Sequence, residues 1–169
     1  MATTTLLHLI PAEDARLRLP SRLVGRTRLS SLSLQCFTRR LAVLLRKLKI
    51  DGGEAVAISA IQVGLPLSLF LIRFKSRFRV IANPQVLWSS EKTVVETEMC
   101  LSLPGLLAQV ERPWAVQVKF ETLDGNSHIR MLTGFNARVF QHEIDHTNGI
   151  LMTDRTHNVK ILKRGKESR

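Results

Sequence analysis

The chain has 169 residues, a formal net charge of +11 and a hydrophobic content of 44%. This length and balance predict one globular domain, residues 1–169, and exclude a membrane-spanning chain, because no apolar run approaches the ~18 residues that a spanning helix needs. The excess of 25 Lys and Arg over 14 Asp and Glu predicts attraction to polyanions such as nucleic acid, but no motif for reading a specific DNA sequence accompanies it.

The two cysteines, Cys36 and Cys100, are too few for a disulfide framework, so a reducing compartment, the cytoplasm, is expected. The first residues lack the basic segment and long apolar core of a signal peptide. Residues 16–40 are rich in Arg and Ser, which keeps organellar targeting open as an alternative. Glu13 and Asp14 and the helix that follows argue against it.

After an irregular stretch over residues 1–30, a helix is predicted from about Ser33 to Lys49. Leucines and one phenylalanine recur there at helical spacing, and arginines and lysines occupy the other face. We interpret Cys36 as an inert small hydrophobic residue of this helix, which Asp51-Gly52-Gly53 ends.

A series of short strands is predicted next. Small residues over 55–64 precede them and would let another chain approach the backbone closely. The predicted strands are 67–73, 80–82 stopped by Asn83-Pro84, 93–98, 116–120, and 128–132 after a hairpin turn at Asp124-Gly125. A helix, then strands, then one more helix predicts an α+β fold, with antiparallel strands around the last helix.

That last helix carries the chemistry. It is expected to start at Gly134 and to stop at Gly149. His142 and His146, four residues apart, project from one face of a helix and can hold a transition metal. Glu143 between them then lies close enough to act on a water at the metal.

A third ligand is still required, because a catalytic metal usually takes three protein ligands and keeps one open position. Cys100 is the candidate. Pro104 and Gly105 are expected to break regular structure just after it, which would leave Cys100 at the end of a strand. A thiolate there, facing the two imidazoles, would complete a Cys-His-His set.

Three motifs, in this order, resemble those of the peptide deformylases, enzymes that remove the N-formyl group from nascent bacterial and organellar proteins. Residues 141–146 match Gln-His-Glu-x-Asp-His in full, and residues 98–102 match Glu-Gly-Cys-Leu-Ser except that Met99 replaces glycine. Residues 55–62 match Gly-x-Gly-x-Ala-Ala-x-Gln only in part. Ala60 and Gln62 fit, but Ala55 and Ala57 replace the glycines and Ser59 the first alanine. The resemblance runs from about residue 34 to residue 154.

This resemblance implies a metal-dependent hydrolase that acts on nascent formyl-methionyl peptides and uses Fe(II), with zinc, nickel or cobalt as alternative ions. It implies the ligands Cys100, His142 and His146, and Glu143 as general base and acid. Gln62 and the backbone N–H of Leu101 would hold the formyl oxygen. The implied substrate-binding residues are Val56, Ala57, Ile58, Glu98 and Met99.

The altered first motif leaves a second interpretation open, a metal-binding relative with lost or changed activity that serves as a binding module at the ribosome. A zinc endopeptidase fits less well, since only His157 follows the helix as a third ligand. The charge also predicts ribosome contact through a basic, flexible tail over about 157–169. Its cations are Lys160, Lys163, Arg164, Lys166 and Arg169.

Overall fold

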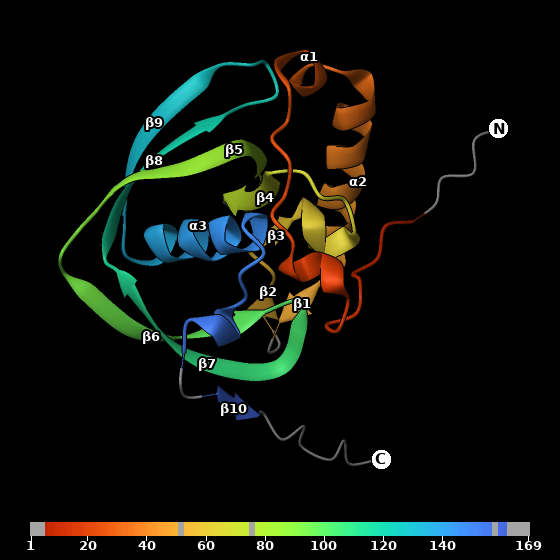
Figure 1. Ribbon diagram of the computed structural model, residues 1–169. Coiled ribbons are helices and arrows are strands. Elements are labelled where there is room, and N and C mark those ends of the chain that lie inside the picture. Colours follow the sequence, from red (N-terminus) through yellow and green to blue (C-terminus); the bar gives the residue numbers. More distant parts are fainter. Residues whose placement is uncertain (1–5, 51–52, 75–76, 157–158, 162–169) are drawn as a thin grey trace, which may run out of the picture.

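Helix α3, Gly134–Thr147, lies in the middle of the molecule with β-sheets wrapped around it (Figure 1). The computed structural model describes residues 6–50, 53–74, 77–156 and 159–161. One sheet has five strands in the order β3-β4-β5-β8-β9, and another has three in the order β10-β7-β6. All pairings in these sheets are antiparallel. The predicted α+β fold is confirmed.

The first half of the chain contains the helices η1 and α1, the long helix α2, a small strand pair and the start of the large sheet. Their bounds are η1 Ala15–Arg18, α1 Arg26–Leu29, α2 Leu32–Lys47, β1 Lys49–Ile50, β2 Gly53–Glu54, β3 Ala57–Ser59, η2 Ala60–Val63 and β4 Leu69–Phe74. The second half consists mostly of strands that lead into α3. These elements are β5 Arg77–Ser89, β6 Thr93–Cys100, β7 Leu103–Pro113, β8 Ala115–Glu121, β9 Ser127–Thr133, η3 Met152–Asp154 and β10 Val159–Ile161.

Both faces of the five-stranded sheet are covered, as the sequence of β4 shows. Successive side chains of a strand point to opposite faces. Leu69 and Leu71 join the core shared with α2, whereas Phe70 and Ile72 join the core shared with α3. On the α3 side, the rings of Phe70 and Phe140 meet edge to face with their centroids 5.2 Å apart. This packing fixes the height of α3 above the sheet.

Helix α2 lies close to the predicted range and is capped by Ser31, whose hydroxyl accepts from the backbone N–H of Leu34. It buries Leu34, Leu41 and Leu45 against the sheet. Cys36, interpreted as an inert small hydrophobic residue, lies on the exposed face of the helix and is not part of the core. The predicted stop signal falls largely on residues 51–52, which lie outside the described part of the chain.

Two strands run through positions predicted to stop them. β5 continues past Asn83-Pro84 because a register shift between Ala82 and Gln85 accommodates a residue at φ 50° and a proline that has no N–H to donate. β7 likewise includes Pro104-Gly105, with Gly105 at φ 80°. The predicted flexible tail over about 157–169 includes one ordered strand, because β10 pairs with β7. Residues 157–158 and 162–169 lie outside the described ranges.

The N-terminal segment belongs to the fold. Leu17, Val24 and Leu29 are buried, and the backbone N–H of Ser21 donates to the carbonyl of Thr147 at 2.8 Å, at the end of α3. The Arg- and Ser-rich stretch over 16–40 is therefore an integral part of the domain. Across the described residues, no helix combines the length and apolar character needed to cross a membrane.

Helix α3 ends as expected before Gly149, which has φ 73°. A Cβ atom at this glycine would lie 2.5 Å from the carbonyl oxygen of Arg18, whereas one at Gly125, with φ 79°, would meet nothing within 4 Å. Both alanine substitutions carry a left-handed penalty of ~1–2 kcal/mol. We expect Gly149→Ala to cost ~1–3 kcal/mol more than Gly125→Ala in urea unfolding, because only the former overpacks the backbone. Equal losses would contradict this account.

Candidate metal centre

Three side chains converge beside α3 to form a set of metal donors. Cys100 ends strand β6, and its Sγ lies 3.2 Å from Nε2 of His146. The donor atoms of Cys100, His142 and His146 all lie within 4.8 Å of one another. Cys100 and His146 are buried, with 2% and 1% of their surface exposed, while His142 is partly exposed. The predicted convergence of the thiol with the two imidazoles is confirmed.

The ring of His142 is oriented by Glu98. Its Nδ1 lies 2.9 Å from Oε2 of Glu98, which leaves Nε2 to face the donor set. A carboxylate behind a histidine ligand fixes the tautomer and raises the basicity of the other nitrogen. The geometry is therefore that of a prepared ligand rather than of a chance pair of histidines on a helix.

The electrostatics of the site also fit a metal. Burial by itself would raise the pKa of the Cys100 thiol, but His146 and His142 outweigh it and hold that pKa well below its ordinary value. A thiolate is the form that binds metal. One thiolate and two imidazoles, held close together and partly buried, suit a first-row divalent ion.

Glu143 lies beside the donor set without belonging to it. Its carboxylate oxygen Oε2 accepts a hydrogen bond from the hydroxyl of Ser59 at 2.6 Å. Burial raises the pKa of Glu143, and the neighbouring His146 and His142 oppose the rise. A buried carboxylate in this position can accept a proton from a reacting group and return it.

Gln62 also reaches the site. Its side-chain oxygen accepts from the backbone N–H of Ser59 at 2.8 Å, and its amide nitrogen donates to the hydroxyl of Ser102 at 2.9 Å. The same nitrogen lies 3.8 Å from Sγ of Cys100. The amide is buried and points to the thiol, away from bulk solvent.

A network of buried charges supports the metal centre, and the sequence did not indicate it. Arg112, on β7, binds Glu98 at 2.5 Å and Asp145 at 2.8 Å, and Asp145 also receives Arg155 at 2.6 Å. Arg138, on α3, binds Glu98 at 2.7 Å. These groups meet only in the folded chain, so the one sequence signal was the presence of Glu98 and Asp145 in the motifs. The hydrogen bonds from Arg112 and His142 outweigh the effect of burial and hold the pKa of Glu98 well below its ordinary value.

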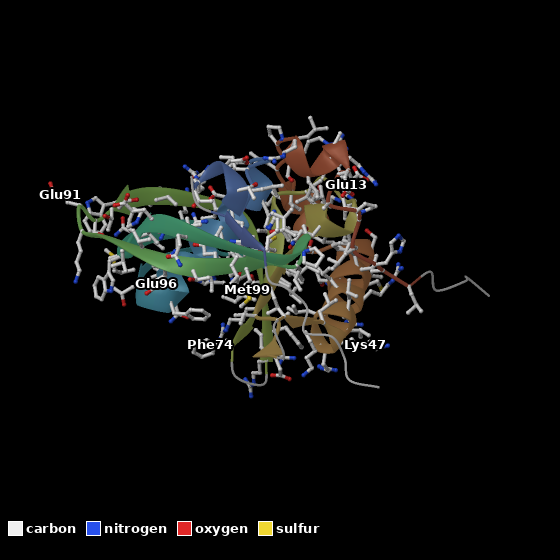
Figure 2. All side chains as sticks on the ribbon, turned by 90° about the horizontal axis from the view of Figure 1, so that it is seen from below. Glu13, Lys47, Phe74, Glu91, Glu96 and Met99 are labelled. Carbon is white, nitrogen blue, oxygen red and sulfur yellow. The ribbon has the colours of Figure 1, made fainter. Side chains whose placement is uncertain are left out.

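A cavity of about 410 Å³ opens beside this centre. Of the residues predicted for catalysis or substrate binding, those that line it are Val56, Ala57, Gln62, Glu98, Met99, Leu101 and Glu143. Ile58 does not line it, because its side chain is fully buried in the core against α2. In the view of Figure 2, Met99 lies between Glu96, on the same strand, and Lys47, at the end of α2. Both oxygens of Glu98 are occupied by Arg112, Arg138 and His142, so this side chain supports the wall of the cavity.

A thiolate and two histidines from one helix, with a carboxylate between those histidines and an open cavity in front, define a metal-dependent hydrolase. A sequence profile of the family described as Polypeptide deformylase matches residues 7–161. The chain belongs to this family.

Relatives and solved structures agree with this assignment. The chain is 38% identical to the peptide deformylase of Bradyrhizobium diazoefficiens, over 71% of this chain and 79% of the relative. The match to the peptide deformylase of Thermotoga neapolitana, at 36% identity, covers 64% of this chain and 66% of that one. The crystal structure of the Thermotoga maritima enzyme superposes with a TM-score of 0.81 at 29% identity, covering 90% of this chain and 99% of that one. A Synechococcus elongatus peptide deformylase in complex with actinonin gives 0.80 at 30% identity, with coverages of 94% and 82%.

The charge network should make stability depend on pH through Glu98. The pKa of Glu98 is lower in the folded state than in the unfolded state. The stabilisation that ionised Glu98 gives the folded state is therefore fully present above the ordinary carboxyl value of 4.5 and is lost as the pH falls below it. We expect Glu98→Gln to lower the free energy of unfolding of the metal-free protein by ~3–5 kcal/mol at pH 7. The gap from wild type should narrow as the pH falls below 4.5.

Glu96→Gln is the matched control, since Glu96 also contacts Arg138 from β6 but is 54% exposed. It should cost about 1 kcal/mol or less. A Glu98→Gln deficit that stays constant from pH 7 into acid would show that the carboxylate charge is not responsible.

Proposed function

We propose that this protein hydrolyses the N-formyl group of nascent formyl-methionyl polypeptides and releases formate and a free amino terminus. The observation that carries the proposal is the set of Cys100, His142 and His146 with Glu143 next to it at the cavity. The membership of the chain in the deformylase family supports it.

The bound metal would supply Lewis-acid chemistry, activating water and polarising the formyl group. Cys100, His142 and His146 would hold it. We propose Fe(II) as the resident ion, with zinc, nickel or cobalt as substitutes, on the resemblance described above. The mixed thiolate and imidazole donors are compatible with each of these ions.

Glu143 would carry the proton. In this proposal its carboxylate takes a proton from the attacking water and delivers it to the amine as the formyl C–N bond breaks. Its burial supports the role, because a raised pKa makes a carboxylate a better proton acceptor at neutral pH.

Gln62 and the backbone N–H of Leu101 would donate to the formyl oxygen as negative charge develops on it. The Gln62 nitrogen has two hydrogens, one of which serves Ser102. The other lies on the side of the thiol, and this is the one that we assign to the substrate.

The substrate backbone would extend the sheet at β3. This strand is at the edge of the five-stranded sheet, and no other strand among those described pairs with its outer side. An extended peptide can add to such an edge through main-chain hydrogen bonds. Val56 and Ala57 would face it from one side, and Glu98 and Met99 from the other.

We also propose that the enzyme meets its substrate at the ribosome, in the cytoplasm. The two free cysteines fit a reducing compartment.

The basic tail remains one candidate contact, although Lys163, Arg164, Lys166 and Arg169 lie outside the described residues. A second candidate is the surface of α1 and α2. Residues 15–50 carry ten cations and no acid, and the exposed ones include Arg22, Arg26, Arg28, Arg39 and Arg46. We call this surface the α1–α2 basic face.

The role of Glu143 is tested with Glu143→Ala in the metal-loaded protein. We expect formate release from a formyl-Met peptide to fall by at least ~10²-fold, since a general base is lost, while the metal content stays that of wild type. Glu91→Gln, which alters an exposed acid, should change nothing. If the metal-loaded wild type releases no formate, the alternative of a ribosome-associated binding module is favoured.

The ribosome proposal predicts a steep dependence on salt. Replacing Arg26, Arg28 and Arg39 of the α1–α2 basic face by Gln should weaken ribosome binding in co-sedimentation about tenfold. The dependence of log K on log salt should also become less steep, because fewer counterions are released. The equally charged control changes Arg77, Arg79 and Lys119, three exposed cations of the large sheet. Truncation after Ile161 tests the tail without removing β10 or Arg155, which binds Asp145. Equal ribosome binding by all four proteins at low salt would dismiss both surfaces.

A further inference from the structure

Ser59 makes two contacts that the proposed mechanism does not yet use. Its side chain is completely buried at the end of β3, in front of η2. The hydroxyl donates to Oε2 of Glu143 at 2.6 Å, and the backbone N–H donates to the side-chain oxygen of Gln62 at 2.8 Å. One residue therefore holds both the carboxylate and the amide that the mechanism assigns to proton transfer and to the formyl oxygen.

We propose that Ser59 is a positioning residue for Glu143, and that it fixes the distance between this base and Gln62. The inference rests on the proposed function, because it supposes that Glu143 and Gln62 act on one substrate. It adds a residue outside the metal donor set, which consists of Cys100, His142 and His146.

The local geometry supports this role. Among the described residues, Ser59 is the hydrogen-bond donor to the Glu143 carboxylate, and it binds only one of the two oxygens, Oε2, of a residue that lines the cavity. A hydroxyl–carboxylate contact is short and charge-assisted, so it restricts the three side-chain torsions of a glutamate. Glu143 has no ion pair with a Lys or Arg within the described ranges that would hold it instead.

Ser59 itself is held rigidly. It pairs with Phe70 in the ladder of β3 and β4, and Phe70 is fully buried against Phe140 of α3. The hydroxyl is also 3.3 Å from the backbone carbonyl of Glu143, so strand and helix approach closely at this point. A reactive group displaced by about 1 Å can lose ~10²-fold in rate, which is why such a rigid support matters.

The test is a double-mutant cycle on the metal-loaded protein, with wild type, Ser59→Ala, Glu143→Ala and the double variant. We expect Ser59→Ala to lower kcat for a formyl-Met peptide about tenfold, the value of one charge-assisted hydrogen bond, with KM within about twofold and metal content unchanged. In the Glu143→Ala background, the same substitution should lower the residual rate by less than about twofold, because no carboxylate remains to be held.

Two controls separate positioning from packing. Ser68→Ala removes another buried serine hydroxyl, which belongs to a residue that does not line the cavity, and should leave kcat unchanged. Ser59→Thr keeps a hydroxyl on the same carbon and should keep kcat within about threefold of wild type. Urea unfolding of the four metal-free proteins gives a readout independent of activity, in which the two substitutions should be non-additive.

Several outcomes would overturn the proposal. They are a kcat of Ser59→Ala equal to or above that of wild type, an equal loss in both Glu143 backgrounds, equal losses in the alanine and threonine variants, and additive effects on unfolding. A metal-loaded wild type that releases no formate would instead remove the proposed function itself, and this inference with it. An active wild type with an unaffected Ser59→Ala would remove the inference alone.

Discussion

A helix that carries polar side chains into the protein interior must find a partner there for each of them, and the structure around α3 follows from this requirement. Arg138, Gln141, Glu143, Asp145 and His146 are all buried. Burying such groups costs several kcal/mol unless hydrogen bonds and opposite charges offset it. The three-stranded sheet supplies Glu98 and Arg112 for that purpose, and the end of β3 supplies Ser59.

The same arrangement connects stability with chemistry. Glu98 lies at the centre, because it binds Arg112 and Arg138 with one oxygen and His142 and Arg112 with the other. The orientation of a metal ligand therefore depends on the ion pairs that hold β6 and β7 against α3. On the opposite side of the helix, Phe140 and Ile144 pack in the apolar core of the large sheet. One face of α3 is fixed by packing and the other by charge.

The features that the sequence predicts are local ones. Helix α2 and the metal helix follow from hydrophobic spacing and from two histidines four residues apart, and Cys100 from its position before Pro104 in a motif. β7 and the second half of β5 escaped prediction, because proline and glycine are tolerated where a register shift or a left-handed glycine absorbs them. Arg112 could not be paired with Glu98 from the sequence, since β6 and β7 had first to be recognised as neighbours. The hydrogen bond from Ser59 to Glu143 could not be predicted either, since β3 and α3 had first to be recognised as neighbours.

The contact between the N-terminal segment and the end of α3 has a consequence for folding. Ser21 donates to the carbonyl of Thr147, and the backbone at Arg18 leaves room only for a glycine at position 149. During synthesis residues 18–21 are made long before the helix end on which they dock. Pairing segments so distant in the chain requires closing a very long loop, and such high contact order slows folding. The same order of synthesis applies to the donor set, because both histidines precede Thr147 by only a few residues. The donor set can therefore assemble only after the chain has been synthesised through His146.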